Sequence, residues 1–375
     1  MKKIIILGAG MVGKAMAIDL SKEYKVKSVD IDKDSLNYLS ANYKIETEVL
    51  DVTNEKNLSN VIQNFDLVIS AVPGFLGLQT MKTVIKNKKD LVDISFLPEG
   101  VLDLDDMAKE YGVTVVMDCG VAPGMPNIIA GYHHEKMQIE NFEYMVGGLP
   151  KERTFPFEYK APFSPCDVIE EYTRPARFVE NGEMVVKPAM SDTELLDFEN
   201  IGTLEAFNSD GLRSLIYTLS DIPNMKEKTL RFPGHIKMIQ ALKAAGFLDY
   251  SPIKVKGKEI VPFDVTSEIL FKSWKLNPED KEFTIMRVKV QGKENGVKKE
   301  ITYDLYDEYD PIEKISSMAR TTGFTATATA DMILNNVFNE KGMFPPELVG
   351  KRPECFKYIL NYLEKRNIHY LKTEI

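Results

Sequence analysis

Short apolar runs alternate with amphipathic segments along the first third of the chain. Apolar residues recur with helical spacing over residues 13–24, 54–64, 78–87 and 102–111, and Gly112 is placed to end the last helix. The runs between these segments have the length and composition of buried strands: Ile4–Leu7, Val26–Val29, Ile45–Leu50, Leu67–Ala71, Leu91–Ile94 and Val113–Met117. This alternation predicts an α/β domain with a doubly wound parallel sheet and crossover helices.

The pattern changes after Asp118 to longer strands and irregularly placed helices. Two Asn-Gly pairs, Asn181-Gly182 and Asn295-Gly296, are typical of two-residue hairpin turns. Around the second pair, apolar side chains share one face of each strand: Met286, Val288 and Val290 before the turn, and Ile301, Tyr303 and Leu305 after it. We therefore expect an α+β second domain, dominated by antiparallel hairpins with one buried face.

A long helical pattern returns over residues 312–336. Its centre, residues 323–330, is rich in Gly, Ala and Thr, and such small side chains permit a close approach of another backbone. We expect this helix to pack tightly against the first domain.

Composition narrows the class of protein without naming a function. A chain of 375 residues predicts two domains, and a net charge of -9 opposes a wide nucleic-acid surface. No stretch has about 20 uninterrupted apolar residues, so we expect no membrane span. The three cysteines, Cys119, Cys166 and Cys355, are widely separated and fit no metal-ligand spacing. We expect no metal site, and a reducing cytoplasm fits best.

A glycine-rich turn, Gly8-Ala9-Gly10-Met11-Val12-Gly13, directly follows the first strand and opens a helix. In this context the first glycine permits a tight turn, the second lets a pyrophosphate approach the backbone, and the third lets helix and strand pack closely. The N–H groups at the helix N-terminus then bind the anion. We predict a Rossmann dinucleotide site that includes Gly8, Gly10, Met11, Val12 and Gly13.

The ends of the later strands belong to the same crevice, because ligands of open α/β sheets bind beyond the carboxyl ends of the strands. Asp30, about 20 residues after Gly10, is placed to bond the adenosine ribose 2′-hydroxyl and to repel a 2′-phosphate. NAD is therefore favoured, although Lys33 nearby leaves NADP open. The remaining strand-end residues are Asp51 and Val52, expected near the adenine, and Ala71, Val72 and Pro73, expected at the nicotinamide half.

Five further segments resemble those of saccharopine dehydrogenases and the related lysine 6-dehydrogenases. They are residues 118–128 (DCGVAPGMPNI), 144–150 (YMVGGLP), 204–207 (LEAF), 230–235 (LRFPGH) and 318–323 (MARTTG), and they occur in the family's order. The resemblance implies oxidation of a carbon–nitrogen bond with hydride transfer to NAD or NADP. It also implies a Rossmann domain over residues 1–122, completed by a C-terminal helical return over about 310–375. Residues 123–309 would then form an inserted substrate-binding and dimerisation domain, usually in a homodimer.

Dehydrogenation of an amine needs a neutral nitrogen and groups that anchor the charged ends of the substrate. His235 has the ordinary pKa best suited to proton removal near neutrality, and Asp118 ends the sixth strand, beside the nicotinamide. We predict both as catalytic. The competing interpretations are a structural histidine and an aspartate that caps the tight turn at residues 120–124.

Guanidinium groups are the best partners of amino-acid carboxylates, and four arginines lie in the expected substrate domain: Arg174, Arg177, Arg213 and Arg231. Arg213 is our first choice for the substrate, followed by Arg231. Tyr159, Lys160 and Glu205 match family stretches that border the substrate. Packing or solvation is the alternative for each of these residues.

The resulting hypothesis is a cytoplasmic, homodimeric, NAD(P)-dependent dehydrogenase that oxidises a C–N bond of lysine or of a lysine adduct such as saccharopine. Its partner is a small amino-acid substrate, with neither nucleic acid nor membrane. One alternative is a reductase of the same family that forms a secondary amine from an aldehyde and an amine. Another is a non-catalytic regulatory protein that binds NAD.

Overall fold

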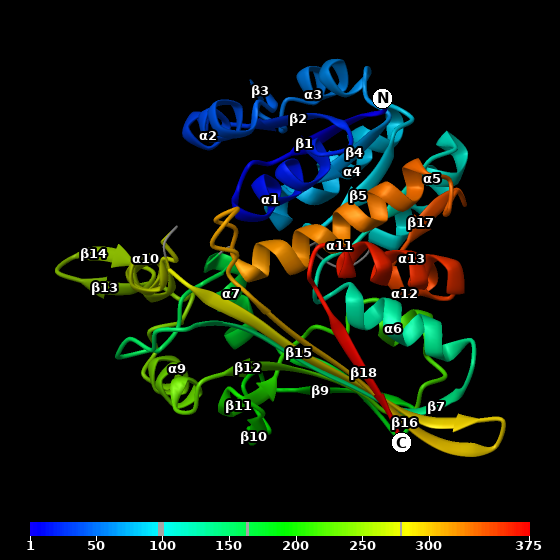
Figure 1. Ribbon diagram of the computed structural model, residues 1–375. Coiled ribbons are helices and arrows are strands. Elements are labelled where there is room, and N and C mark those ends of the chain that lie inside the picture. The colour runs from blue at the N-terminus through cyan, green and yellow to red at the C-terminus, as the bar shows by residue number, and fades with distance from the viewer. Residues whose placement is uncertain (97–100, 163–164, 278–279) are drawn as a thin grey trace. The chain divides into compact units, whose positions relative to one another are not determined.

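The computed structural model describes residues 1–96, 101–162, 165–277 and 280–375 (Figure 1). The chain forms two compact units. The first consists of Met1–Gln138 with Met318–Tyr370, and the second of Ile139–Ser317 with Leu371–Ile375. No helix among the described residues is both long enough and apolar enough to cross a bilayer.

A seven-stranded parallel sheet forms the centre of the first unit, in the order β17-β6-β5-β4-β1-β2-β3. Its strands are β1 (Lys3–Leu7), β2 (Lys25–Asp30), β3 (Glu46–Val49), β4 (Leu67–Ser70), β5 (Asp90–Asp93), β6 (Thr114–Val116) and β17 (Gly342–Phe344). All six predicted strands are confirmed. The pattern did not predict β17, because a strand of three residues has no readable periodicity.

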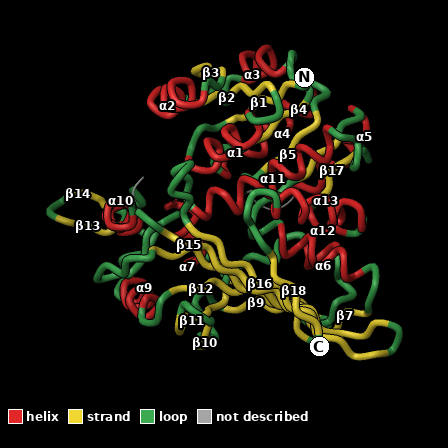
Figure 2. The backbone as a smooth tube through the Cα atoms, viewed as in Figure 1, coloured by secondary structure: helices red, strands yellow, loops and turns green. Residues whose placement is uncertain are grey.

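The helices of this sheet are α1 (Met11–Ser21), α2 (Lys33–Tyr43), α3 (Glu55–Ile62), α4 (Gly74–Lys86) and α5 (Asp105–Tyr111), seen as red segments in Figure 2. The four predicted helices are present, and Gly112 ends α5 with a φ of 67°. The pattern missed α2, because only Leu36 and Leu39 are buried along it.

The C-terminal part of the first unit contains α11 (Ser317–Leu334), α12 (Pro346–Gly350) and α13 (Pro353–Glu364). A Cβ atom on Gly323 would lie 3.0 Å from Met16 Cγ and 3.4 Å from Val12 Cγ1, so α11 packs closely on α1, as its small residues predict. The helix begins five residues later than expected, because Asp310 and Ile315 pair with each other before it.

α6 (Met125–His134), which we expected in the second domain, lies in the first unit. It packs backbone to backbone on α12: a Cβ on Gly131 would lie 2.0 Å from the Glu347 carbonyl oxygen, and one on Gly350 would lie 2.2 Å from that of Ile128. The compact first unit therefore extends beyond residue 122.

The buried carboxylate of Asp19 joins three helices of the first unit. Arg366 Nε donates to it at 2.6 Å, and the hydroxyls of Thr327 and Tyr362 each donate at 2.7 Å. The Asp19 side chain is 1% exposed and that of Arg366 14%. These bonds connect α1 to α11, to α13 through Tyr362, and to Arg366 just after α13.

The second unit is built on a nine-stranded mixed sheet, in the order β10-β11-β12-β7-β15-β16-β18, with β8 also paired to β12 and β9 paired to β8. Its strands are β7 (Gln138–Pro150), β8 (Ala176–Glu180), β9 (Glu183–Lys187), β10 (Glu194–Phe198), β11 (Gly202–Asn208), β12 (Met225–Arg231), β15 (Glu282–Glu294), β16 (Val297–Glu308) and β18 (Tyr370–Glu374). Most neighbours are antiparallel, whereas β7 and β12 run parallel.

Both predicted hairpins are present. Asn181 and Gly182 have φ values of 53° and 83°, and Asn295 and Gly296 have 51° and 81°, as the turn type requires. The predicted buried face pairs across β15 and β16, with Met286 opposite Leu305, Val288 opposite Tyr303 and Val290 opposite Ile301.

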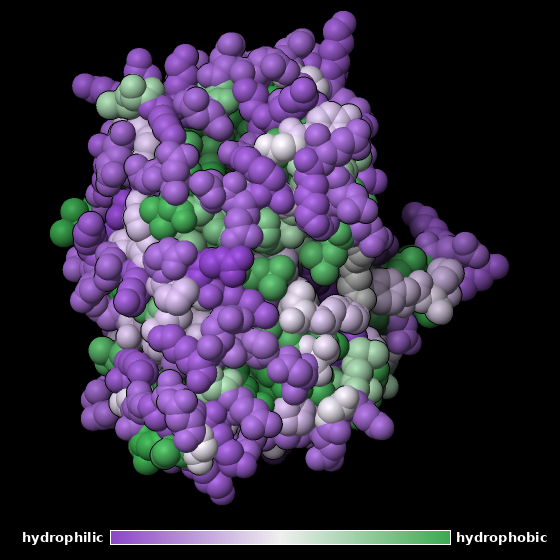
Figure 3. Space-filling view, turned by 90° about the vertical axis from the view of Figure 1, so that its right-hand side faces the viewer, coloured by the Kyte–Doolittle hydropathy of each residue, from purple (hydrophilic) through white to green (hydrophobic). Residues whose placement is uncertain are grey.

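The second unit also contains α7 (Pro165–Thr173), α8 (Leu215–Thr218), α9 (His235–Ala244), α10 (Pro262–Trp274) and a small hairpin of β13 (Ile253–Val255) and β14 (Lys258–Ile260). Trp274 is fully buried in its core, together with Tyr172 and Leu230. Polar side chains predominate on the face drawn in Figure 3, as expected for elements that bury their apolar face.

Replacing Asp19 by Ala is expected to lower the free energy of unfolding by about 3–5 kcal/mol, because the Arg366 guanidinium then loses its buried partner. Urea denaturation at pH 7 measures the change. Lys109→Ala is the control, since its exposed pair with Asp105 is screened by solvent and contributes little to stability. Equal small losses in the two variants would contradict a stabilising role for the Asp19 network.

Candidate active site

The three glycines of the turn after β1 have three different environments. Gly8 has a φ of 108°, and a Cβ on it would lie 2.6 Å from the Ala71 carbonyl oxygen. A Cβ on Gly13 would lie 2.1 Å from the Gly8 carbonyl oxygen, whereas nothing lies within 4 Å of the corresponding point on Gly10. The turn is thus tight at its first glycine, open at its second and closely packed at its third, which fits a bound pyrophosphate.

α1 begins at Met11, directly after Gly10, and no side chain caps its first turn. The Val12 side chain faces Gly323 of α11 and so packs between α1 and α11. The first N–H groups of α1 are therefore presented at the open glycine, which is the arrangement that holds an anion at a helix N-terminus.

Asp30 ends β2 beside this turn. Its carboxylate accepts the Ala9 N–H at 2.5 Å and the Asp32 N–H at 2.8 Å. A carboxylate fixed in this way fits the hydroxyls of an adenosine ribose. Asp32 in turn caps α2, accepting the Asp34 N–H at 3.0 Å.

The other predicted cofactor residues follow β3 and β4 at the same edge of the sheet. The Asp51 carboxylate accepts the N–H and the hydroxyl of Thr53 at 2.9 and 2.7 Å, and these bonds lower its pKa. Val52 is half-buried, and Ala71, Val72 and Pro73 directly follow Ser70 of β4. The sheet thus brings all the predicted cofactor residues to the carboxyl ends of its strands.

Asp118 follows β6 and is 3% exposed, with a φ of 49° that is unusual for a residue other than glycine. The next residue, Cys119, donates its N–H to the Asp93 carbonyl oxygen at 3.1 Å, so Asp118 lies beside the end of β5.

Asp93, which no sequence pattern had marked, is fully buried at that strand end. Its carboxylate accepts the N–H and the hydroxyl of Ser95 at 2.9 and 3.0 Å. The pKa of Asp93 is raised to about 7, chiefly by burial and also by the charge of Asp118. The hydrogen bonds of Ser70 and Ser95 act in the opposite direction. A carboxylate at the end of an apolar strand was the signal that could have identified it.

In the second unit, His235 begins α9 and is 2% exposed. Its Nδ1 lies 2.9 Å from the Phe157 carbonyl oxygen, which only accepts, so Nδ1 carries the proton. Nε2, 3.0 Å from the Tyr172 hydroxyl, then accepts. Burial lowers the pKa of His235 to about 3, and the charge of Arg231 adds to that shift, so the ring is neutral near pH 7.

Arg231 lies in the same cluster, with its side chain 3% exposed. Its Nε donates to the Tyr172 hydroxyl at 3.0 Å, Nη2 donates to Glu171 at 2.5 Å, and the guanidinium lies 4.4 Å from the centre of the Tyr159 ring. The hydrogen bonds therefore all point in one direction. Arg231 donates to the Tyr172 hydroxyl, that hydroxyl donates to His235 Nε2, and His235 Nδ1 donates to the Phe157 carbonyl oxygen.

Glu205 and Lys160 have more peripheral contacts. Glu205 is buried and accepts the Gly234 N–H at 3.0 Å, next to His235. Lys160 donates to the Ser273 carbonyl oxygen at 3.3 Å. Residues 163 and 164, which follow soon after Lys160, lie outside the described residues. The structure thus gathers Tyr159, Arg231, His235 and Glu205, and adds Tyr172, Glu171 and Trp274, which no sequence pattern had marked.

Arg213 is buried in the loop between β11 and α8. Asn208, which precedes the loop, pairs with Lys228 in the middle of β12, whereas Arg231 at the end of β12 pairs with Glu205. The two predicted substrate arginines therefore belong to different segments of the second unit.

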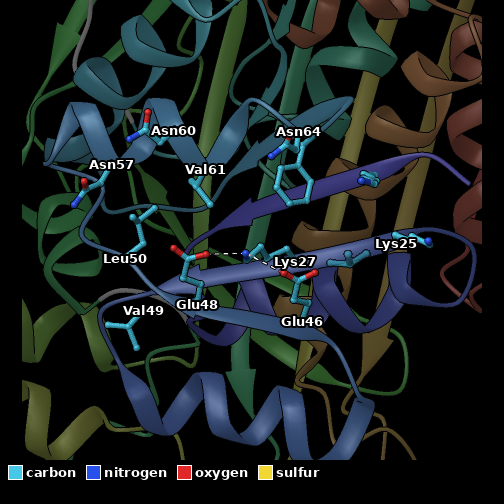
Figure 4. Close-up of a pocket in the computed structure, with 13 residues that line it drawn as sticks. Lys25, Lys27, Glu46, Glu48, Val49, Leu50, Asn57, Asn60, Val61 and Asn64 are labelled. Atoms are coloured by element: carbon cyan, nitrogen blue, oxygen red, sulfur yellow. Dashed lines mark ion pairs between the residues drawn. The ribbon is translucent and has the colours of Figure 1, made fainter.

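A groove of about 720 Å³ runs along the flank of the first sheet, between α3 and the strands β2 and β3 (Figure 4). Lys27 crosses its floor and pairs with Glu46 at 2.9 Å and with Glu48 at 2.7 Å. The groove does not lie at the carboxyl ends of the strands, and its central lysine is already neutralised. We assign it no part in the chemistry.

Comparison with known proteins places both parts of the chain in one family. Residues 4–116 match the model described as the saccharopine dehydrogenase NADP binding domain, and residues 120–368 match the saccharopine dehydrogenase C-terminal domain. The apo saccharopine dehydrogenase (L-Glu forming) from Saccharomyces cerevisiae superposes with a TM-score of 0.82 and 19% identity over 100% of both chains. This likeness confirms the predicted α/β fold.

Two curated relatives differ in length. The mitochondrial alpha-aminoadipic semialdehyde synthase of Rattus norvegicus is 24% identical over 421 residues, covering 92% of this chain and 45% of that protein. The chain thus spans about half the length of this relative. The carboxynorspermidine synthase of Vibrio cholerae is 22% identical over 394 residues, covering 93% of each protein.

The pKa of His235 makes stability depend on pH. An ordinary histidine pKa near 6.5 in the unfolded chain and one of about 3 in the folded chain mean that only the unfolded state takes up a proton as the pH falls from 7 to 5. The stabilisation is complete above about pH 6.5 and is lost on acidification. Between pH 7 and 5, the wild type is expected to lose about 2 kcal/mol more than His235→Gln.

Urea unfolding at both pH values measures this difference. The exposed His369, replaced by Gln, serves as the control and is expected to retain the wild-type slope. Parallel pH profiles for the wild type and His235→Gln would show that the ring is not buried in its neutral form.

Proposed function

This chain belongs to the saccharopine dehydrogenase family, and we propose that it is an NAD(P)-dependent oxidoreductase that oxidises the secondary amine of saccharopine or of a related lysine derivative. The observation that carries the proposal is the carboxyl edge of the seven-stranded sheet. There the glycine turn, Asp30 and the buried Asp118 lie at the carboxyl ends of β1, β2 and β6, as cofactor and chemistry require in this architecture.

The nicotinamide, when bound, supplies the hydride acceptor, and the chain positions the substrate. For saccharopine, hydride leaves the carbon next to nitrogen, an imine forms, and water hydrolyses it. The balanced products are glutamate, α-aminoadipic semialdehyde, the reduced cofactor and a proton.

We assign proton handling to Asp118, which lies beside the backbone of Asp93 in the first unit. A neutral imidazole with a pKa of about 3 is a weak base near neutrality. We therefore assign to His235 the role of holding the Tyr172 and Tyr159 side chains in position. If Asp118 handles the proton, Asp118→Asn lowers kcat. The competing prediction is that His235 is the catalytic residue.

We assign the substrate's carboxylates to the second unit, with Arg213 as the first binding residue. Arg231 is already bonded to Tyr172 and Glu171, so its main part is to hold the cluster of Tyr159 and His235 in place. Two buried arginines in the second unit, Arg213 and Arg231, suit a substrate with several carboxylates better than they suit free lysine.

A second candidate is the reductive direction, in which an aldehyde and an amine condense and the imine is reduced to a secondary amine. The observation that favours it is the Vibrio cholerae carboxynorspermidine synthase, which aligns with this chain over 93% of both lengths. The same residues serve either direction, because the bond that changes is the same.

We further propose a cytoplasmic homodimer. Two of the three cysteines, Cys119 and Cys355, are free and buried, which suits a reducing compartment. Size-exclusion chromatography with light scattering measures the oligomeric state.

Formation of NADH or NADPH at 340 nm tests the activity directly. We expect turnover with saccharopine and little or none with lysine, ornithine or diaminopimelate. Consumption of the reduced cofactor only when an aldehyde and an amine are supplied together would favour the second candidate. Binding of cofactor without turnover of any of these compounds would overturn the enzymatic proposal.

We propose that cofactor choice depends on the acidic ends of β2 and β3, where the charges of Asp30 and Asp51 lie near the expected 2′ position and disfavour a phosphate there. We therefore propose a preference for NAD, although the matched family model is an NADP binding domain. Asp30→Asn keeps an oxygen that accepts the Ala9 N–H and removes the charge. It is expected to raise the ratio of kcat/KM for NADP to that for NAD about tenfold or more.

Asp34→Ala, at the exposed start of α2, is the matched control and is expected to leave this ratio unchanged. A wild type that already prefers NADP would contradict the role given to Asp30.

A further inference from the structure

The loop from Ser209 to Arg213 is held from three strands of the second sheet. Arg177 of β8 binds the Asp210 carboxylate, Glu227 of β12 accepts the Gly211 N–H at 3.0 Å, and Tyr144 of β7 donates its hydroxyl to the Gly211 carbonyl oxygen at 2.5 Å. The backbone of this loop is therefore fixed before any ligand binds.

The contact between Arg177 and Asp210 is the most specific of the three. Arg177 Nε lies 2.8 Å from Oδ1 and Nη2 lies 2.7 Å from Oδ2, and the Arg177 N–H also donates to Oδ1 at 3.1 Å. The two side chains are 13% and 4% exposed. A buried, two-pronged contact of this kind fixes both the distance and the orientation of the carboxylate.

The loop also contains backbone geometry that needs support. Arg213 has a φ of 54°, in the left-handed region that favours glycine. A Cβ on Gly211 would lie 2.6 Å from Glu227 Cδ, so a larger residue there would displace the Glu227 side chain that accepts the Gly211 N–H. Such a conformation persists only when the surrounding contacts impose it, and strain of this kind gathers at functional sites.

We propose that Arg177 is a positioning residue for substrate binding: acting through Asp210, it fixes the Ser209–Arg213 loop and thereby places Arg213 against a carboxylate of the substrate. The inference rests on the proposed function, because it takes Arg213 as the carboxylate-binding residue. Arg177 itself does not touch the substrate, since both prongs of its guanidinium are bonded to Asp210.

A double-mutant cycle on the full chain, with saccharopine as the probe, tests this inference. Arg213→Met is expected to raise the KM for saccharopine about tenfold or more, with a smaller change in kcat. Arg177→Lys keeps the charge but loses the two-pronged contact, and is expected to raise the same KM about tenfold. If Arg177 acts through Arg213, the double variant has the KM of Arg213→Met alone.

Arg287→Lys is the matched control. Arg287 Nε donates to Asp304 at 2.6 Å across β15 and β16 of the same sheet, so this variant also weakens an arginine–aspartate pair. Its KM for saccharopine is expected to stay within twofold of the wild type. The Kd for NAD is expected to be unchanged in all variants. If Arg177→Lys does not fold, Asp210→Asn breaks the same contact from the other side.

The outcomes separate the inference from the proposed function. The positioning role would be overturned if the KM increases of Arg177→Lys and Arg213→Met multiplied in the double variant. It would also be overturned if Arg177→Lys had the wild-type KM. An unchanged KM in Arg213→Met would overturn it as well, by removing Arg213 from the substrate site. A wild type that neither turns over saccharopine nor binds it in calorimetry would overturn the proposed function and the inference together, and the wild-type measurement alone reveals that case.

Discussion

Burial of one carboxylate, that of Asp19, connects the cofactor end of the first unit with the last part of the chain. An isolated charge at 1% exposure is strongly unfavourable, so the helix that carries it is stable only when Arg366, Thr327 and Tyr362 are in place. That helix, α1, begins at the glycine turn. The geometry of the glycine turn therefore depends on residues more than 300 positions later in the chain.

The second unit uses the same principle at two places on one sheet. Arg231 is balanced by Glu171 and Tyr172, and Arg177 is balanced by Asp210. Each of these two arginines thus has its partners within the unit, and such rigidity is what a site for a polar substrate needs. Arg213 is buried as well, with a strained backbone in a loop that other residues hold in place.

Family membership and cofactor choice depend on different numbers of residues. The family match extends from residue 4 to residue 368, through the packing of both units. The proposed preference for NAD rests on a few charges at the ends of β2 and β3, where Asp30 accepts the Ala9 N–H. Such a preference is compatible with the match to an NADP binding domain, because the match depends on the packing of the whole domain and the preference on these few charges.

The sequence by itself determined the features that depend on neighbouring residues. The apolar runs located six strands, the Asn-Gly pairs located two hairpins, and the glycine spacing identified a turn whose three glycines have distinct surroundings. Each is a local property, because backbone conformation and strand alternation are decided within a few residues. The family resemblance added the class of reaction. Weak local signals explain the missed α2, with two buried residues, and β17, with three residues in all.

Only the tertiary structure decided the surroundings of the candidate side chains. His235 was chosen for its ordinary pKa, but Phe157, Tyr172 and Arg231, from distant segments, make it a buried neutral ring. Asp93 became notable only once β5 and β6 were adjacent, and Arg177 only once β8 met the loop of Asp210. Burial and pairing are properties of the assembled chain, because the dielectric surroundings of a group and its hydrogen-bond partners come from residues far away in sequence.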